Sequence, residues 1–369
     1  MLFRTILSKH TVQVIFWVFL GLASCSPEKQ SSTLFTAVPA EESNVFFNNQ
    51  VVDEEKYNTL FFANFYGGAG VAIGDLNNDG LQDLYFTGNQ VGDKLYINQG
   101  SLSFDDITSE AGIKDDGGWS SGVLLGDVNK DGYLDIYVTR EMYGNQSGLL
   151  KNKLYINNQD QTFTESAEAW GIDNDGRSRG GTFFDYDNDG DLDLFLLNTP
   201  PNPGPLVDIE IESLLLDEYS SVLYENTGSE FRDITKTAGL LKPGFPNSVV
   251  AADLNNDGFQ DLYITHDFTI PDCIYINNGN GTFSDKMASM TGHISFGSMG
   301  VDASDINNDG MLDLFVTDMS AEDNYRIKAN MGGMNPEAFW NVVDQGGHYQ
   351  YMYNTLQINT GQEHFSDIA

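Results

Sequence analysis

The sequence predicts an all-β protein built as a β-propeller of four-stranded blades, and three observations lead to that prediction. A nine-residue acidic motif recurs five times. Each copy runs into a short segment rich in aromatic and β-branched residues, and two more strand-like segments follow in every unit. The motifs begin 52, 58, 68 and 52 residues apart. Four strands repeated at such spacings are typical of propeller blades.

Composition limits the function before any motif is considered. The 369 residues include 18 Lys and Arg against 54 Asp and Glu, which gives a formal net charge of -36. That balance argues against binding to nucleic acid or to anionic lipid through basic patches. The chain is also 40% hydrophobic and 12% aromatic, so it can bury a core rather than remain disordered.

Residues 1–24 are typical of an export signal. Two cationic residues precede an apolar run from Val12 to Ala23, which is short for a bilayer span. The run ends in Leu22-Ala23-Ser24-Cys25, which resembles a bacterial lipobox. The resemblance implies lipidation of Cys25, a tether over residues 25–34, contact with the membrane through that lipid only, and an outer-membrane location on the periplasmic or surface side. An ordinary signal peptide with a chance Cys, or an uncleaved anchor, is the alternative.

The recurring motif is Asp-x-(Asn/Asp)-x-Asp-Gly-x-x-Asp. Hard cations such as Ca²⁺ take six to eight oxygen ligands, and alternate residues of a tight loop can direct oxygens at one centre. Positions 1, 3, 5 and 9 offer side-chain oxygens, whereas position 7 is expected to offer its backbone carbonyl. The glycine at position 6 is expected to have positive φ. A zinc or copper site is disfavoured, because no Cys and no spaced His pair accompanies the motif.

We therefore predict about five structural Ca²⁺ ions, with metal-free polar turns as the alternative. The predicted ligands of the five loops, in chain order, are Asp75, Asn77, Asp79, Leu81 and Asp83; Asp127, Asn129, Asp131, Tyr133 and Asp135; Asp185, Asp187, Asp189, Asp191 and Asp193; Asp253, Asn255, Asp257, Phe259 and Asp261; Asp305, Asn307, Asp309, Met311 and Asp313.

The segment that follows each loop separates this motif from an EF-hand, whose loop continues to a Glu at position 12 and enters a helix. Here each loop enters a strand such as Leu84–Thr87. A third segment follows, typified by Leu95-Tyr96-Ile97-Asn98, and then a fourth short strand around Phe104. The metal loop is therefore predicted to join the first and second strands of each blade.

The sequence resembles the FG-GAP/VCBS repeat family, whose calcium-loop propellers include the integrin α-subunit head. Three features carry the resemblance: the acidic loops, the Leu-Tyr-Ile-Asn strands, and the segments that end a repeat, such as Ile107–Gly112. The resemblance is closest to bacterial VCBS-repeat lipoproteins related to cartilage acidic protein, which often carry an ASPIC/UnbV segment. It covers about residues 35–369 and implies the fold and the metal.

The repeat pattern is incomplete at both ends of the sequence. Phe35–Val38 is expected to form an isolated fourth strand, and the chain stops within the recurring pattern at Phe365–Ala369. Because the resemblance implies about seven blades, five loop-bearing units predict an incomplete or truncated ring. An exposed sheet edge would then favour self-association.

Two insertions, 198–221 and 319–354, interrupt the repeats. Long loops on a rigid scaffold often carry recognition, although a packed cap is the alternative. In the second insertion we nominate Trp340, His348, Tyr349 and Tyr351 as ligand-binding residues. The partner, a protein or a carbohydrate, is not identified by the sequence.

The sequence contains no convincing catalytic constellation. Gly118–Gly122 matches G-x-S-x-G, but that motif requires a strand-to-helix elbow and here precedes a metal loop. We therefore expect a binding or interaction module. The alternative is a carbohydrate-active lyase or hydrolase that uses the propeller face, for which His348 and Tyr349 are the candidate residues.

Overall fold

A computed structural model describes residues 34–368, except 56, 61, 63, 142–148, 202–215, 268–269, 322, 324, 327–335 and 345–346. The chain divides into two compact units, Met1–Glu42 and Ser43–Ala369. The predicted signal and the predicted lipidation site Cys25 lie outside the described residues. Within those residues no helix combines the length and the apolar character needed to cross a membrane.

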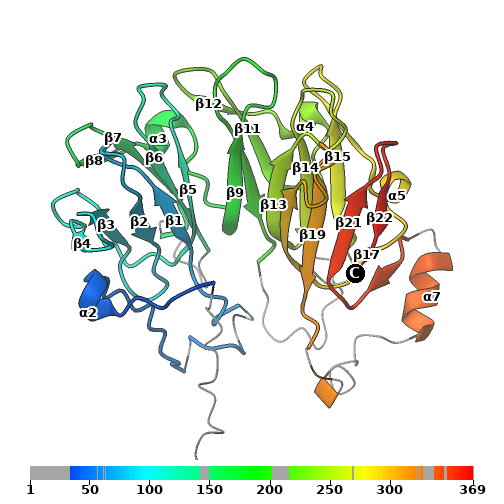
Figure 1. The fold of residues 1–369 in the computed structure, drawn as a ribbon, viewed down its shortest axis with the longest axis horizontal. Coiled ribbons are helices and arrows are strands. Elements are labelled where there is room, and N and C mark those ends of the chain that lie inside the picture. The colour runs from blue at the N-terminus through cyan, green and yellow to red at the C-terminus, as the bar shows by residue number, and fades with distance from the viewer. Residues whose placement is uncertain are drawn as a thin grey trace, which may run out of the picture. The chain divides into compact units, whose positions relative to one another are not determined.

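The second unit contains five four-stranded antiparallel sheets, in each of which the strands lie side by side in chain order (Figure 1). We number them blades 1 to 5 in chain order. Blade 1 contains β1 (Val71–Gly74), β2 (Asp83–Phe86), β3 (Lys94–Asn98) and β4 (Phe104–Asp106); blade 2 contains β5 (Ser120–Gly126), β6 (Asp135–Arg140), β7 (Lys153–Asn157) and β8 (Phe163–Glu165). Blade 3 contains β9 (Ser178–Phe184), β10 (Asp193–Asn198), β11 (Val222–Asn226) and β12 (Phe231–Asp233); blade 4 contains β13 (Pro246–Ala252), β14 (Asp261–His266), β15 (Cys273–Asn277) and β16 (Phe283–Asp285); blade 5 contains β18 (Ser298–Ser304), β19 (Asp313–Asp318), β21 (Thr355–Asn359) and β22 (Phe365–Asp367). The predicted all-β fold and the predicted four-stranded units are confirmed.

The meander decides which loops share an end of the blades. Successive strands alternate in direction, so the acidic loop between the first and second strands lies at the same end as the turn between the third and fourth. The connections from second to third strand lie at the other end, and both predicted insertions are of this kind. The second connection spans residues 319–354, between the end of β19 and the start of β21. The first begins at residue 199, one residue later than predicted, because β10 ends at Asn198.

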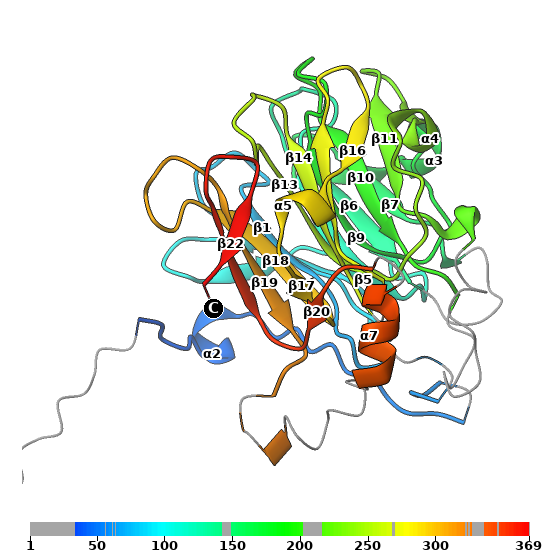
Figure 2. The ribbon, with the colours of Figure 1, turned by 90° about the vertical axis from the view of Figure 1, so that its right-hand side faces the viewer.

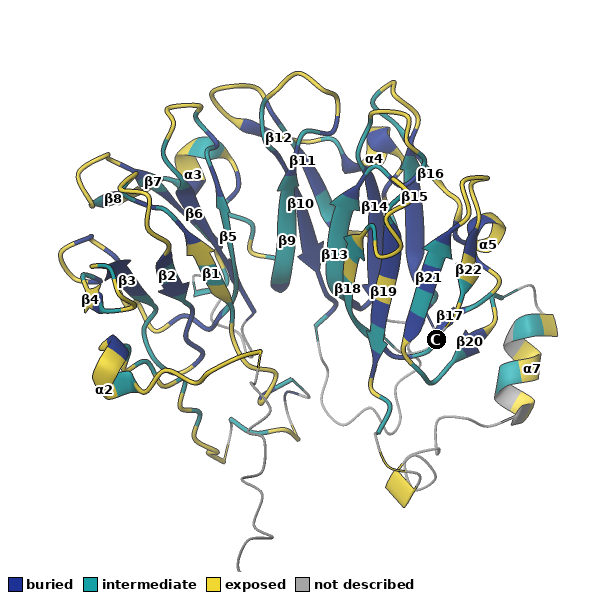
Figure 3. Cartoon of the chain, in the orientation of Figure 1, coloured by how far each residue is buried: buried dark blue, intermediate teal, exposed yellow. Residues whose placement is uncertain are grey.

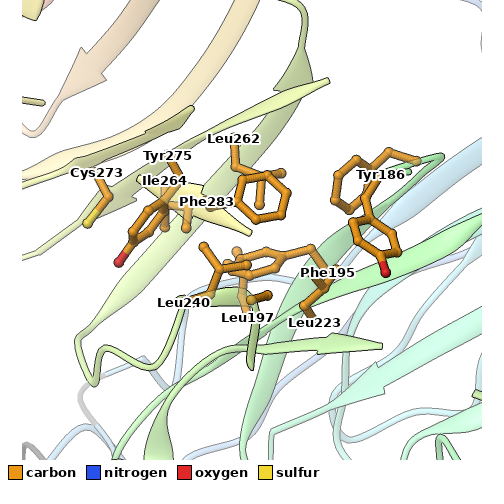
Figure 4. Packing of buried hydrophobic residues seen from close by; sticks show 12 residues of the cluster. Tyr186, Phe195, Leu197, Leu223, Leu240, Leu262, Ile264, Cys273, Tyr275 and Phe283 are labelled. Atoms are coloured by element: carbon orange, nitrogen blue, oxygen red, sulfur yellow. The ribbon is translucent and has the colours of Figure 1, made fainter. Parts of the chain in front are cut away.

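Apolar side chains pack between neighbouring blades, and the strands carry most of the buried residues (Figure 3). Blades 2, 3 and 4 each contribute alternate residues to a core on either face, because side chains alternate across a strand. The core between blades 3 and 4 shows this pattern: Phe195 and Leu197 of β10 lie in one cluster with Leu262 and Ile264 of β14 (Figure 4). Similar cores lie between blades 1 and 2, 2 and 3, and 4 and 5.

Several short elements were not predicted. The helical turns α3 (Ala167–Trp170), α4 (Thr235–Ala238) and α5 (Met287–Met290) follow the fourth strands, and the 3₁₀ turn η4 (Asp217–Tyr219) precedes β11. In the insertion 319–354, the helix α7 (Pro336–Asp344) leads to β20 (Gln350–Tyr351), which pairs in parallel with β17 (Ile294–Ser295). Figure 2 shows α7 beside this small sheet.

The isolated strand predicted at Phe35–Val38 is wrong. Residues 35–39 have no regular structure, Phe35 is 90% exposed, and the short helix α2 (Ala40–Ser43) follows. The sequence segment is apolar and β-branched, but a strand requires a hydrogen-bonding partner, and none pairs with it among the described residues. The described part of blade 1 therefore begins at Val71.

Candidate metal centres and a polar pocket

The five acidic loops share one backbone conformation. The glycine at position 6 has φ between 85° and 91° in every loop, as predicted from the motif. Position 4 also adopts the left-handed conformation, with φ of 57° to 61°, at Asn78, Lys130, Asn188, Asn256 and Asn308. Two left-handed residues so close together fold the nine residues tightly, which brings their oxygens together.

Backbone amides fix the first carboxylate of each loop. In the first loop, Asp75 Oδ1 accepts a hydrogen bond from the Asp79 amide at 3.1 Å, and Oδ2 accepts one from the Gly80 amide at 2.8 Å. The other four loops repeat both bonds at 2.8–3.1 Å. These carboxylates are therefore ordered by the loop itself, and binding an ion would not require them to be reorganised.

The ninth-position Asp lies beneath the loop and ties it to the blade. Asp83 Oδ2 accepts the amide of Leu76 at 2.9 Å, while Oδ1 accepts the amide of Asn98 in the third strand at 2.8 Å. The same pair of bonds recurs in all five blades at 2.8–3.0 Å. Burial raises the pKa of Asp135, Asp193 and Asp261 to about 7, despite these bonds. A bound cation would favour the ionised form of each.

The third loop gathers the most charge. Carboxylate oxygens of Asp185, Asp187 and Asp193 lie within 4.8 Å of one another. All predicted side-chain ligands in the five loops are oxygens, and this donor set suits a hard cation such as Ca²⁺ rather than zinc or copper. The residues present therefore fit the predicted ion.

In three of the five loops, the side chain at position 7 contacts a group outside its own loop. Asp191 forms an ion pair with Lys130 of the neighbouring loop. Phe259 and Met311 lie over glycines of the turns between third and fourth strands, where a Cβ on Gly279 or Gly361 would come within 2.9 Å of them. These side-chain contacts are compatible with the prediction that position 7 offers the loop its backbone carbonyl.

In blades 2 to 5, the asparagine that ends the third strand connects the blade to the preceding one. Asn277 Nδ2 donates to the carbonyl of Tyr186, at loop position 2 of the preceding blade, at 2.7 Å. Asn157, Asn226 and Asn359 make the equivalent bond at 2.8–2.9 Å. Sequence analysis recognised this asparagine only as part of the repeated Leu-Tyr-Ile-Asn segment. The recurrence of this asparagine indicated a shared role. The sequence did not identify its hydrogen-bond partner, because that partner is about 80 to 105 residues distant.

A polar pocket of about 260 Å³ lies at the opposite end of the first strands from the acidic loops. Four of its lining residues, Ser121, Arg179, Asn247 and Met299, are equivalent: each is the extra residue where the pairing of the first strand with the second shifts by one. Such bulges re-aim a side chain out of the regular alternation. One bulged position from each of blades 2 to 5 thus contributes to a single pocket.

Arg179 is the main charged group of this pocket. Its guanidinium donates to Asn247 Oδ1 and lies 3.4 Å from Glu141 Oε1, and both Arg179 and Glu141 are largely buried. Trp119 lines this pocket and also a neighbouring cavity of about 630 Å³ that is lined by Gln50, Asn89 and Gln90. Amides, a guanidinium, a carboxylate and an indole together offer hydrogen bonds and one apolar wall. Sequence analysis missed these residues, because a bulge leaves no mark in the sequence.

The four nominated ligand-binding residues lie elsewhere, around α7 and β20. The ring of Phe339 stacks on Tyr351 at 5.6 Å and contacts Trp340 and Tyr349 edge-on or tilted. His348 instead contacts Thr291 Oγ1 through Nε2 at 2.9 Å. The structure thus brings the three aromatic residues into one cluster around Phe339, which sequence analysis did not name. None of the four nominated residues lines either cavity described above.

The G-x-S-x-G match has an ordinary structural role. Ser120 begins the strand β5, and its hydroxyl lies 3.3 Å from a carboxylate oxygen of Asp93. A nucleophile elbow would place it between a strand and a helix.

The repeated blades and their loops define a class of protein, the repeat propellers. A family model described as FG-GAP-like repeat matches residues 75–138, 142–196, 211–264 and 271–316, and the chain belongs to this family. Among curated relatives, cartilage acidic protein 1 of Mus musculus is 24% identical over 235 residues, covering 63% of this chain and 34% of the relative. The protein of the same name from Homo sapiens is 23% identical over the same length, covering 63% of this chain and 33% of the relative. The chain thus spans about a third of the length of these relatives.

The chain is also similar to chains of solved structures. A structure described as the recognition of non-reducing terminal N-acetylglucosamine by an Agrocybe aegerita lectin gives a TM-score of 0.45 at 17% identity, covering 80% of this chain and 64% of that chain. The V. cholerae biofilm matrix protein Bap1 gives a TM-score of 0.35 at 17% identity, covering 69% of this chain and 35% of that chain.

Proposed function

We propose that this chain is a calcium-stabilised propeller module that binds a protein or carbohydrate ligand on an exported, lipid-anchored protein. One observation carries the proposal: the two ends of the blades differ in chemistry. All five acidic loops lie at one end. The long second-to-third-strand connections and the pocket around Arg179 lie at the other. One end is thus suited to hold ions, and the other to meet a ligand.

The role we assign to calcium is structural. Each loop already holds its first and ninth carboxylates with backbone amides, and the ninth Asp joins the loop to the third strand. An ion that binds the folded loop and not the unfolded chain stabilises the fold by mass action. We expect about five ions to bind, with a large loss of thermal stability in chelator that Ca²⁺ reverses and Mg²⁺ does not.

Elemental analysis and thermal unfolding test this role, using protein from Ser26 onward. The third loop supplies a matched pair of variants. Asp187→Ala removes a converging carboxylate and should lower bound calcium by about one ion, whereas Asp191→Ala removes a carboxylate that faces Lys130 and should leave the number unchanged. Equal calcium content in both variants and the wild type, or an unchanged melting temperature in chelator, would contradict the proposal.

For ligand binding we propose recognition rather than catalysis, at the end of the blades opposite the ions. The pocket suits a polar group with hydroxyls or a carboxylate, because Arg179, Asn247 and Glu141 offer donors and an acceptor beside the indole of Trp119. A glycan array with neutral and acidic sugars, probed in calcium, tests it. Arg179→Ala should lose the signal, and Arg232→Ala, an exposed arginine of β12, should keep it. Equal signals from both variants would place binding elsewhere.

Export and lipid anchoring rest on the N-terminal residues. Mass spectrometry of the mature protein from a membrane fraction should find Cys25 as the first residue, carrying acyl chains. Cys25→Ala should release the protein from that fraction. A mature N-terminus at any other residue would refute the anchor.

A further inference from the structure

Neighbouring acidic loops are joined to one another through their fourth residues. Asn78, at position 4 of the first loop, donates from Nδ2 to the carbonyl of Gly132, at position 6 of the second loop, at 2.8 Å. In the second loop, position 4 is Lys130, and its ammonium pairs with Asp191 of the third loop. The equivalent bonds from the third and fourth loops measure 3.0 and 3.4 Å and are donated by Asn188 and Asn256. Each pair of neighbouring loops is therefore linked at this position.

The link reaches a predicted ligand of the receiving loop. The carbonyl of Gly132 belongs to the peptide whose amide, that of Tyr133, donates to Asp131 Oδ1 at 2.9 Å. Asp131 is the predicted position-5 ligand of the second loop. The fourth and fifth loops repeat this second bond at 2.9 Å. Because hydrogen bonds in series polarise one another, the side chain at position 4 of one loop helps to hold a carboxylate of the next.

A second link runs in the opposite direction, through the asparagine that ends the third strand of blades 2 to 5. The backbone amide of Asn157 donates to Asp135 Oδ1, the ninth-position carboxylate of its own loop, at 2.8 Å. Its side-chain Nδ2 donates to the carbonyl of Leu76, at position 2 of the preceding loop, at 2.8 Å. The same two bonds are made by Asn226, Asn277 and Asn359. One residue thus holds a predicted ligand of one loop and the backbone of the loop before it.

We propose that neighbouring loops bind calcium cooperatively, because each loop holds part of its neighbour in the conformation that receives an ion. The inference rests on the calcium role proposed above and adds that the ions do not bind independently. An ion in the first loop fixes the ligands on either side of Asn78, and Asn78 then fixes the Gly132 peptide of the second loop. Coupling between two sites is reciprocal, so an ion in the second loop favours binding in the first by the same factor. Position 4 is not a predicted ligand, and its residue is a positioning residue.

Repulsion between the ions acts in the opposite direction. A divalent ion in one loop disfavours a second ion nearby, whereas an empty acidic loop attracts it. Electrostatics alone therefore predicts that emptying the first loop strengthens ion binding in the second. Coupling through the hydrogen bonds predicts that it weakens that binding. The sign of the effect separates the two accounts.

Tyr133 allows the second loop to be observed separately from the others. It occupies position 7, whose backbone carbonyl is a predicted ligand. Terbium(III) binds the oxygen ligands of calcium sites, and a tyrosine beside the bound ion sensitises its luminescence. Tyr133→Phe keeps the backbone carbonyl and removes the phenol, so the luminescence lost in this variant reports the second loop. The experiment is a Tb³⁺ titration of the chain from Ser26 onward, with and without Tyr133→Phe, followed by displacement with Ca²⁺.

Asn78→Gly is the main test variant. It removes the bond to Gly132 and retains the left-handed backbone, because glycine adopts positive φ freely. The Tb³⁺ concentration that half-saturates the Tyr133-dependent signal should rise about two- to tenfold. Asn256→Gly is the matched control, because the two asparagines have φ of 58° and 59° but Asn256 donates to the fifth loop. This control should leave the signal unchanged.

Asp75→Ala tests the ion itself rather than the bond. It removes the first ligand of the first loop and leaves Asn78 in place, so it should shift the Tyr133-dependent signal in the same direction as Asn78→Gly. The emptied loop is more negative than the loaded one, because a divalent ion adds more charge than one Asp removes. Tighter binding in the second loop of Asp75→Ala would therefore show that electrostatics dominates, and would overturn the proposal.

The remaining outcomes separate this inference from the proposed calcium role. An Asn78→Gly titration that coincides with that of Asn256→Gly would overturn the coupling while leaving calcium binding intact. A Tyr133-dependent signal that is absent, or that Ca²⁺ does not displace, would refute calcium binding in the second loop and the coupling with it. Circular dichroism spectra that match the wild type show that a shift does not arise from unfolding.

Discussion

Asn277 offers a sharp test of how the blades are joined. Its Nδ2 donates to the carbonyl of Tyr186 in blade 3 at 2.7 Å and to that of Gln260 at 3.3 Å, while its Oδ1 accepts the amide of Gly279 at 3.0 Å. Asn277→Ala removes all three bonds and leaves the buried carbonyl of Tyr186 without its donor. Each lost bond costs about 1 kcal/mol, and a buried unsatisfied group adds about 1–2 kcal/mol. We expect a loss of about 3–5 kcal/mol in the free energy of unfolding.

Asn98 is the natural control for that variant. It makes the equivalent bonds inside its own blade, to Gln82 and to the Gly100 amide, each at 2.9 Å. Among the described residues Asn98 donates to no other blade, so Asn98→Ala should lower the free energy of unfolding less than Asn277→Ala does, by about 1–3 kcal/mol. Asn226 also donates to the preceding blade, so Asn226→Ala should lower the free energy of unfolding about as much as Asn277→Ala.

Urea unfolding in saturating calcium, followed by tryptophan fluorescence, measures the three variants at a concentration low enough to keep the chain monomeric. Linear extrapolation gives the free energies to be compared. An equal loss for Asn98→Ala and Asn277→Ala would show that the bond across the blades adds nothing.

Two further predictions concern buried titratable groups. Burial raises the pKa of the Cys273 thiol to about 11, although Lys242 Nζ lies 3.0 Å from its sulfur. Ellman's reagent should therefore leave the native chain from Ser26 onward unmodified and react with one thiol after unfolding. Rapid reaction of the native protein would refute this prediction. Burial also raises the pKa of Asp272 to about 7, so the folded state keeps a proton that the unfolded state loses above about pH 4. From pH 4 to 7 the wild type should therefore lose stability relative to Asp272→Asn, by at most about 1.4 kcal/mol per pH unit, and parallel pH profiles of unfolding would contradict this.

The acidic loops show how far local sequence can lead. Asp75, Gly80 and Asp83 lie within nine residues, so their spacing alone specifies a tight turn with a positive φ at the glycine. The strand after each loop follows from its β-branched and aromatic residues. Repetition of the whole unit then predicts the four-stranded blade and the boundaries of the insertion 319–354.

Features that depend on distant residues were not predictable in this way. The partner of Asn277 lies in the preceding blade, and the pocket at Arg179 requires bulges in four first strands to coincide in space. Similarly, Phe35–Val38 has the composition of a strand, but no neighbouring strand hydrogen-bonds with it. Composition indicates that a segment can form a strand, but it forms one only where another strand hydrogen-bonds with it.

The sequence by itself determined the repeat, the acidic loops and the all-β fold, because each depends on contacts within a few residues or on repetition. Only the tertiary structure decided which faces are buried. Ile306 and Leu76 occupy the same position of the same motif and are both apolar, yet one is exposed and the other buried. The difference lies in whether another blade packs against that face, since apolar burial depends on the neighbour as well as on the residue.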